Sequence, residues 1–179
     1  MNTLDQYQSA IASCKEVYLK KAKDYGTSWR VYRSISIADQ IYIKAWRIRQ
    51  IQESGVQQVE DSIESEFMAM VNYGLMALIQ LTLDSHAPTY LGLEEAERYY
   101  DEQVQVVRDL MLRKNHDYGE AWRALSQESF VDLILTKILR IRQILANKGQ
   151  TLISEGIDAN FCDIVNYAVF ALIKIKELS

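Results

Sequence analysis

The pattern Asp-Tyr-Gly-x-x-Trp-Arg occurs twice in this chain and constrains its fold more than any other feature. Residues 23–30 read KDYGTSWR, and residues 116–123 read HDYGEAWR. When the sequence is shifted by 93 positions, 16 of the 38 residues in 14–51 are identical to those in 107–144. One extra residue in the second copy then aligns 55–81 with 149–175, where 9 of 27 residues match. The chain is therefore an internal duplication, and so long a period indicates two fused subunits rather than a solenoid.

The sequence pattern of each copy predicts three helices, so the expected fold class is all-α. One proline and seven glycines in 179 residues leave long uninterrupted elements, and apolar residues recur every three or four positions. We divide the chain into a first repeat (1–83), a linker (84–92) and a second repeat (93–179), packed as one compact domain. The expected helices cover, roughly, residues 4–23, 36–53, 61–83, 93–115, 129–147 and 157–177.

The expected helix ends and packing follow from local signals. Gly26 and Gly119 follow the Asp-Tyr pairs and are expected to end the first helices in the left-handed conformation. Ser36 and Ser129 each precede an aspartate by three positions, which is similar to a capping box. The third helices contain VNYGLMALIQL and VNYAVFALIKI. Helices that are apolar nearly all round are buried, so we expect these two to pack on each other at a pseudo-twofold axis.

Composition and charge exclude several classes of protein. The formal net charge is −4, whereas nucleic-acid-binding proteins are normally basic. We expect no nucleic-acid partner, no membrane span because no long uncharged apolar run occurs, and no signal peptide because the first residues lack the basic-then-apolar pattern. Cys14 and Cys162 have no CxxC partners, which favours two free thiols in a cytoplasmic protein over a disulfide between them.

Asparagine recurs inside the most apolar helix of each copy, as Asn72 and Asn166. A buried amide costs a few kcal/mol, about 1–3, unless it is hydrogen-bonded. One interpretation is an amide bonded to a neighbouring helix, which fixes the packing. The other is an amide that reads a base or sugar, or that supports a metal ligand. In the second copy Asp163 lies one turn before Asn166, whereas the first copy has Ala69 at that position.

Basic pairs recur on the second helix of each copy. Lys44 and Arg47 share one helix face, and so do Lys137 and Arg140. Asp132 lies five residues before Lys137, and Asp39 has the same place in the first copy. Acids that hold Mg²⁺ beside bases that hold phosphate oxygens suit a phosphate chain. The alternative is a solvated pattern in which the bases pair with acids of the third helix, and for Arg49 and Arg142 we favour that alternative.

The Asp-Tyr-Gly-x-x-Trp segment has a local explanation that covers only part of it. The glycine allows a positive φ and the tryptophan plugs the loop onto the bundle, but neither explains Asp24 or Asp117. A loop between the first and second helices is a plausible edge of a site. No GxSxG, P-loop or GxGxxG motif occurs, so a metal-activated water would be the nucleophile of any hydrolysis.

With these motifs in hand, the chain resembles a tandem member of the nucleotide modification associated domain 1 family. The motifs that carry the resemblance are KDYGTSW, KAWRIRQ and VNYGLMALIQL in the first copy, and HDYGEAW, KILRIRQ and DIVNYAVFALI in the second. More distantly, it is similar to the all-α MazG-like nucleoside triphosphate pyrophosphatases, which cleave between the α- and β-phosphates with Mg²⁺. The E-x-x-E and E-x-x-D motifs of those enzymes are not intact here, and D-x-x-N at 163–166 is the nearest match.

The resemblance implies a MazG-like pseudo-dimeric bundle that binds a nucleotide and hydrolyses it in clefts between helices two and three. The second copy is then the better candidate, with Asp163 and Asp132 catalytic. The implied ligands of Mg²⁺ are Asp163, Asp158, Asp132 and Glu155. The implied substrate-binding residues are Lys137, Arg140, Asn166, Tyr118, Asp117, Trp122, Lys44, Arg47, Asn72 and Asp24. The alternatives are a non-catalytic nucleotide-binding or assembly module and a purely structural bundle. An exposed apolar face on the third helix would allow a homodimer of pseudo-dimers.

Overall fold

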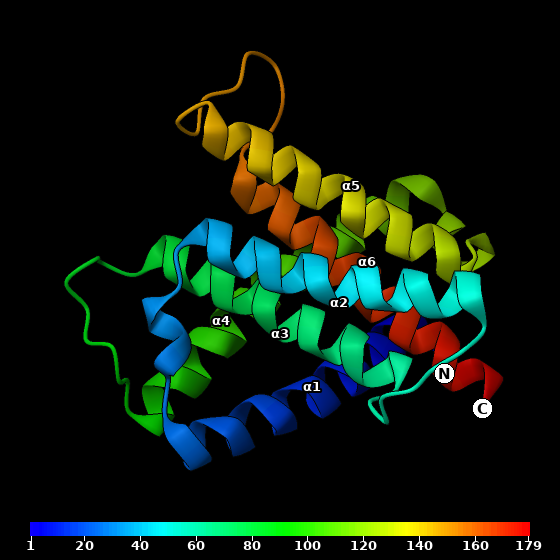
Figure 1. Cartoon of the computed structure of the whole chain (residues 1–179), viewed down its shortest axis with the longest axis horizontal. Helices are drawn as coiled ribbons and strands as arrows, with labels where there is room; N and C mark the ends of the chain where they lie inside the picture. The colour runs from blue at the N-terminus through cyan, green and yellow to red at the C-terminus, as the bar shows by residue number, and fades with distance from the viewer.

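The chain folds into helices joined by short segments. The computed structural model describes residues 1–179, and it contains six α-helices, two 3-10 turns and no strand (Figure 1). In chain order the elements are α1 (Thr3–Tyr25), η1 (Ser28–Val31), α2 (Ser34–Ser54), α3 (Ile63–Thr82), α4 (Leu93–Tyr118), η2 (Ala121–Ala124), α5 (Gln127–Ala146) and α6 (Ile157–Leu178). The expected all-α class and the three helices in each repeat are confirmed.

The helices form three layers of two. The central layer is α3 with α6, while α2 and α5 cover one face of it and α1 and α4 cover the other (Figure 1). The close approach of the central pair depends on Gly74, since a Cβ atom there would lie 2.5 Å from Cγ2 of Val165. The two apolar third helices therefore pack on each other, as predicted. Exposed apolar side chains on the outer helices include Ile43 and Trp46 of α2 and Leu139 of α5.

The capping residues of the second helices differ from the prediction. The helix α2 already begins at Ser34, after Arg33 in extended conformation and without a side-chain cap. In the second repeat the cap is Ser126, whose hydroxyl accepts from the backbone N–H of Ser129 at 3.1 Å. Ser36 and Ser129 therefore lie in the first turns and are not the caps. Each helix begins two residues before the predicted start, shortly after its 3-10 turn.

The two glycines that end α1 and α4 behave differently. Gly119 takes the left-handed conformation, with φ 58° and ψ 39°, as predicted. Gly26 also has a positive φ of 73°, but its ψ of −155° turns the chain in another direction. At this turn Tyr90 of the linker lies so close that a Cβ atom on Gly26 would be 2.8 Å from its ring. The linker packs against the first repeat here, and this contact has no counterpart in the second.

Ion pairs are exchanged between α2 and α5 across the pseudo-twofold axis. Arg49 lies 3.4 Å from Asp132, and Arg142 lies 2.9 Å from Asp39. Since 49 and 142 are equivalent positions, as are 39 and 132, each repeat donates the same arginine to the same aspartate of the other. This reciprocity is the mark of an isologous interface. The expectation that Arg49 and Arg142 pair with acids of the third helix is wrong, because these arginines point along the seam between the repeats.

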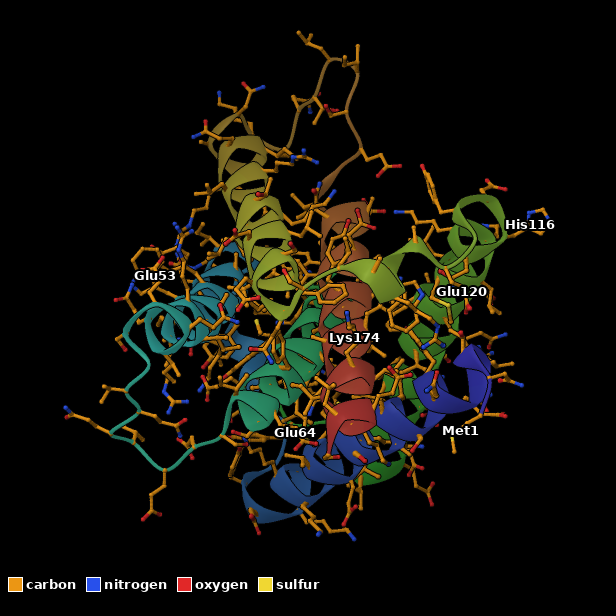
Figure 2. The ribbon with its side chains drawn as sticks, turned by 90° about the vertical axis from the view of Figure 1, so that its right-hand side faces the viewer. Met1, Glu53, Glu64, His116, Glu120 and Lys174 are labelled. Atoms are coloured by element: carbon orange, nitrogen blue, oxygen red, sulfur yellow. The ribbon has the colours of Figure 1, made fainter.

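The repeated Asp-Tyr-Gly-x-x-Trp-Arg segment closes each repeat over the end of its third helix. Trp29 and Trp122 are both 6% exposed. The side chain of Gln80 at the end of α3 donates to the carbonyls of Arg30 and Tyr32, at 2.8 and 2.9 Å. In the second repeat Lys174 of α6 donates to equivalent carbonyls (Figure 2). Packing of the loop onto the third helix therefore explains why the tryptophan is present in both repeats.

The arginines of this segment bind different partners in the two repeats. Arg30 donates to the carbonyls of Ala87 and Pro88, and so holds the linker. Arg123 instead donates to Gln6 of α1 and pairs with Glu177 of α6 at 2.9 Å. The chain termini therefore lie close together (Figure 1). The arginine of the repeated motif therefore binds the linker in the first repeat. In the second repeat it connects the N-terminal and C-terminal helices.

Candidate functional site

The two buried asparagines bond to neighbouring helices in a reciprocal pattern. Asn166 accepts from the hydroxyl of Tyr7 at 2.8 Å and donates to the carbonyl of Val107 at 3.2 Å. Asn72 accepts from Tyr100 at 2.8 Å and donates to the carbonyl of Cys14 at 3.0 Å. In each case the tyrosine comes from the other repeat. The packing interpretation therefore accounts for both amides, and in each the second amide hydrogen makes no bond within the protein.

Asp163 forms a buried ion pair with two lysines. It is 5% exposed, and its oxygens lie 2.7 Å from Nζ of Lys114 and 2.9 Å from Nζ of Lys137. Burial alone would lower the pKa of Lys114, but the hydrogen bond and charge of Asp163 raise it overall. Each lysine binds one oxygen of the carboxylate, so neither oxygen is free for another cation. Lys114, which is not among the predicted substrate-binding or metal-binding residues, is therefore part of this cluster.

The first repeat places its buried acid one turn earlier. Glu66 is 4% exposed and lies 3.5 Å from Lys44 and 3.6 Å from Arg47. Its second carboxylate oxygen is buried without a partner. The equivalent of Glu66 in the second repeat is Asn160, which bonds to the carbonyl four residues before it. Sequence reasoning missed Glu66 because it sought acids at the position of Asp163.

The four residues expected to hold Mg²⁺ do not form one site. Asp132 lies on the seam between the repeats, paired with Arg49, whereas Asp163 is buried between lysines. Asp158 and Glu155 are exposed at the start of α6 and in the loop before it. Nowhere do three His, Cys, Asp or Glu side chains gather as a metal would require. The arrangement does not fit Mg²⁺, because a divalent ion needs several free carboxylate or carbonyl oxygens.

The expected phosphate site in the second repeat is an open depression between α5, α6 and the loop before α6. Its volume is about 1010 Å³, and Lys137, Arg140 and Glu155 line it together with Asn160. Arg140 is exposed, unlike its counterpart Arg47, which donates to the carbonyls of the loop before α3. Lys137 and Arg140 do share one face, as predicted. Lys137 is already paired with Asp163, so Arg140 is the cation there that is free for a ligand.

The remaining predicted residues surround the Asp-Tyr-Gly turns and are mostly exposed. Asp117 pairs with its neighbour His116 at 3.1 Å, and both side chains are solvent-exposed. Figure 2 shows His116 at the end of α4. Tyr118 is 72% exposed, and Asp24 is exposed as well. Trp122 stacks on Phe170 with ring centres 4.2 Å apart, and its indole N–H has no partner. Burial raises the pKa of Tyr167, and Asp163 and Tyr118 both add to that shift, so Tyr118 lies near the Asp163 cluster. No hydrogen bond or ion pair joins Asp24, Asp117 or Trp122 to Asp163.

An aromatic cavity lies instead in the first repeat, between α1, η1 and α3. Its volume is about 380 Å³, within the range typical of small-molecule sites. Lys21 is its one charged lining residue, and the free amide hydrogen of Asn72 belongs to a side chain that also lines it. The lining residues are Val17, Tyr18, Lys21, Tyr25, Ser28, Trp29, Val31, Tyr32, Ser65, Met68, Ala69, Asn72, Tyr73 and Met76.

Three tyrosine hydroxyls lie close to each other at this cavity. Burial raises the pKa of Tyr73, and the neighbouring phenols of Tyr32 and Tyr25 raise it further. Burial also raises the pKa of Tyr25, with contributions from Asp24 and Tyr32. The phenols of Tyr73 and Tyr25 are therefore neutral near pH 7 and can donate hydrogen bonds. Asp24 itself does not line the cavity.

The second repeat fills the equivalent position with its own side chains. Phe170 replaces Met76 and stacks on Trp122, while Leu125 replaces Tyr32. Asp163 replaces Ala69 and binds Lys114, which is the equivalent of Lys21. In the alignment of the two repeats, the positions that differ could have revealed the cavity. The identical positions, on which the sequence prediction relied, do not indicate it.

Taken together, these features define an all-α protein of two fused three-helix repeats with an aromatic cavity in the first. A family model described as nucleotide modification associated domain 1 matches the chain twice, over residues 21–81 and 114–175. The chain belongs to this family, as its motifs predicted. No curated protein and no solved structure matches it, so the similarity to MazG-like pyrophosphatases stays a prediction. None of the helices is long and apolar enough to cross a membrane.

Proposed function

We propose that the protein binds a nucleotide, without hydrolysing it, in the aromatic cavity of the first repeat. The observation that carries this proposal is the lining of the cavity: five aromatic rings, the free amide hydrogen of Asn72, two serines and one lysine. A base has two flat apolar faces and a polar edge, so it stacks on aromatic side chains and bonds to amides and hydroxyls. The description of the family, nucleotide modification associated domain 1, supports the same class of ligand.

The disposition of acids supports binding rather than catalysis. Both oxygens of Asp163 are engaged by lysines, and Asp132 lies on the seam beside Arg49. No acid lines the aromatic cavity. A metal-dependent hydrolase needs acidic or histidine ligands for its metal, or a carboxylate or imidazole base near the reacting phosphorus. The lining of this cavity contains no aspartate, glutamate or histidine.

The proposal is tested by titrating the protein calorimetrically with nucleosides and with their mono- and triphosphates. Met76→Phe copies Phe170 of the second repeat and should fill the cavity by stacking on Trp29, lowering affinity at least about tenfold. Phe170→Met makes the reverse change in the second repeat and should leave affinity unchanged. No binding by any compound, or equal loss in both variants, would disprove the proposal.

A product assay runs beside the titration. The protein is incubated with each triphosphate and Mg²⁺ or Mn²⁺, and the products are separated. We expect no turnover. Formation of monophosphate and pyrophosphate that is lost in Asp163→Asn would instead establish a pyrophosphohydrolase in the second repeat.

A further inference from the structure

We infer that the ligand of the first-repeat cavity is a nucleoside monophosphate, whose phosphate takes the place of a carboxylate that the second repeat supplies itself. This inference rests on the proposed function and specifies its ligand. It starts from the comparison of two equivalent clusters. In the second repeat Lys114 of α4 and Lys137 of α5 meet on Asp163 of α6.

The first repeat keeps both lysines of this cluster and lacks the acid. Lys21 and Lys44 occupy the equivalent positions, but Ala69 stands where the carboxylate would be. Lys44 contacts Glu66 instead, one turn away and at 3.5 Å, a longer separation than the 2.9 Å between Lys137 and Asp163. Lys21 makes no ion pair or hydrogen bond. One cation is therefore left without its anion.

The missing carboxylate would lie at the aromatic cavity. Ala69 and Lys21 both line it, as does Asn72, one turn beyond Ala69 on α3. An anionic group near Ala69 would contact Lys21 as Asp163 contacts Lys114, while the aromatic part of the same ligand reaches Trp29 and Tyr73. The lysine, the free amide hydrogen and the rings thus face one ligand rather than three.

The charge of the lining selects a ligand with few negative charges. Lys21 is the one charged side chain of the cavity, and no acids are placed to hold a metal there. A triphosphate would bring additional negative charges with no partner, whereas a monophosphate brings a single group for one lysine. One charge-assisted hydrogen bond corresponds to roughly tenfold or more in affinity.

Calorimetry at one ionic strength would compare a nucleoside, its 5′-monophosphate, its 5′-triphosphate and inorganic phosphate. We expect the monophosphate to bind roughly tenfold more tightly than the nucleoside and more tightly than the triphosphate, and inorganic phosphate to bind weakly. Lys21→Met should lower monophosphate affinity to that of the nucleoside. Lys114→Met, the same change in the second repeat, should alter neither affinity.

Ala69→Asp supplies the carboxylate from within the chain. It should abolish the advantage of the monophosphate and raise the melting temperature by pairing with Lys21. Equal binding of nucleoside and monophosphate to the unmodified protein would overturn the inference while leaving the proposed function intact. Tighter binding of the triphosphate, or a monophosphate advantage that survives Lys21→Met, would also overturn it. No binding by any nucleoside compound would instead refute the proposed function.

Discussion

The hydroxyl of Tyr7 in the first helix donates to the amide oxygen of Asn166 in the last, at 2.8 Å, and both side chains are buried. Tyr100 and Asn72 form the same bond, so each repeat supplies the phenol for the other's asparagine. This exchange joins the outer helices α1 and α4 to the opposite half of the central layer. A polar pair in the middle of an apolar core makes the association of the two repeats specific, because a shifted packing would leave four polar groups unpaired.

Removing one phenol of this exchange should destabilise the whole fold. Tyr7→Phe leaves the amide oxygen of Asn166 buried without a donor, which costs about 1–3 kcal/mol. Tyr100→Phe should cost a similar amount through Asn72. Denaturation with urea would measure both. A cost near zero for either variant would mean that water replaces the phenol and that the exchange does not stabilise the interface.

Adding a methyl group at Gly74 should disturb the contact between α3 and α6. The new Cβ would lie 2.5 Å from Cγ2 of Val165, so one helix must move or Val165 must leave its rotamer. Overpacking of this kind costs about 1–3 kcal/mol, which exceeds the gain of up to roughly 1 kcal/mol in helix propensity. Gly55→Ala is not a matched control because Gly55 has a positive φ. Ala168→Ser at the position equivalent to Gly74 shows what a single added atom costs on the other helix.

Asp163 and Asp132, the two aspartates that the family resemblance implies to be catalytic, should differ in their effect on stability. Asp163→Asn removes the charge shared by Lys114 and Lys137, and we expect a loss of about 1–3 kcal/mol. Asp132→Asn removes a partly exposed pair with Arg49, whose contribution is small and screened by salt. Melting temperatures of the two variants, measured at low and at high salt, would compare these losses of stability. If Asp132→Asn were the more destabilising change, our assignment of the buried cluster would be wrong.

Stability should fall at alkaline pH because buried tyrosines, among them Tyr7 and Tyr100, are held neutral in the core. Burial raises the pKa of Tyr7 and Tyr100 above their ordinary value of 10.0. In the unfolded chain these phenols ionise near that value, so their contribution is complete below about pH 10 and is lost as the pH rises toward the folded pKa. Urea midpoints measured at several pH values from about 8 to 11 would show the decline. The double variant Tyr7→Phe/Tyr100→Phe should show a smaller decline of the urea midpoint over the same pH range.

The two thiols should be unreactive in the folded protein. Burial raises the pKa of Cys14 to about 12 and that of Cys162 to about 11, with smaller contributions from Glu64 and from Asp158. The thiolate is the reactive form, so Ellman's reagent at about pH 8 should modify neither until the chain unfolds. Both thiols are free, as the sequence predicted, and both are buried. Labelling of the native protein within seconds would show that α1 or α6 opens locally.

Much of the architecture could be read from the sequence because it depends on local periodicity and on the repeat. The 93-residue shift divided the chain into two units, and the apolar third helices identified the central layer. Glycines after Asp-Tyr identified where α1 and α4 end. The same repeat misled the search for caps at Ser36 and Ser129, since a conserved local pattern does not say how many residues a loop turn consumes.

The site could not be read in the same way, because its side chains meet only when distant segments pack. Nothing in the sequence states that Asp132 faces Arg49 of the other repeat, or that Lys114 reaches Asp163 from a different helix. The sequence by itself determined that the chain is a duplicated all-α protein with two buried central helices and polar residues among them. Only the tertiary structure decided which repeat holds the cavity. An ion pair and a stacked Phe170 occupy that space in the second repeat, whereas Ala69 and Met76 leave it open in the first.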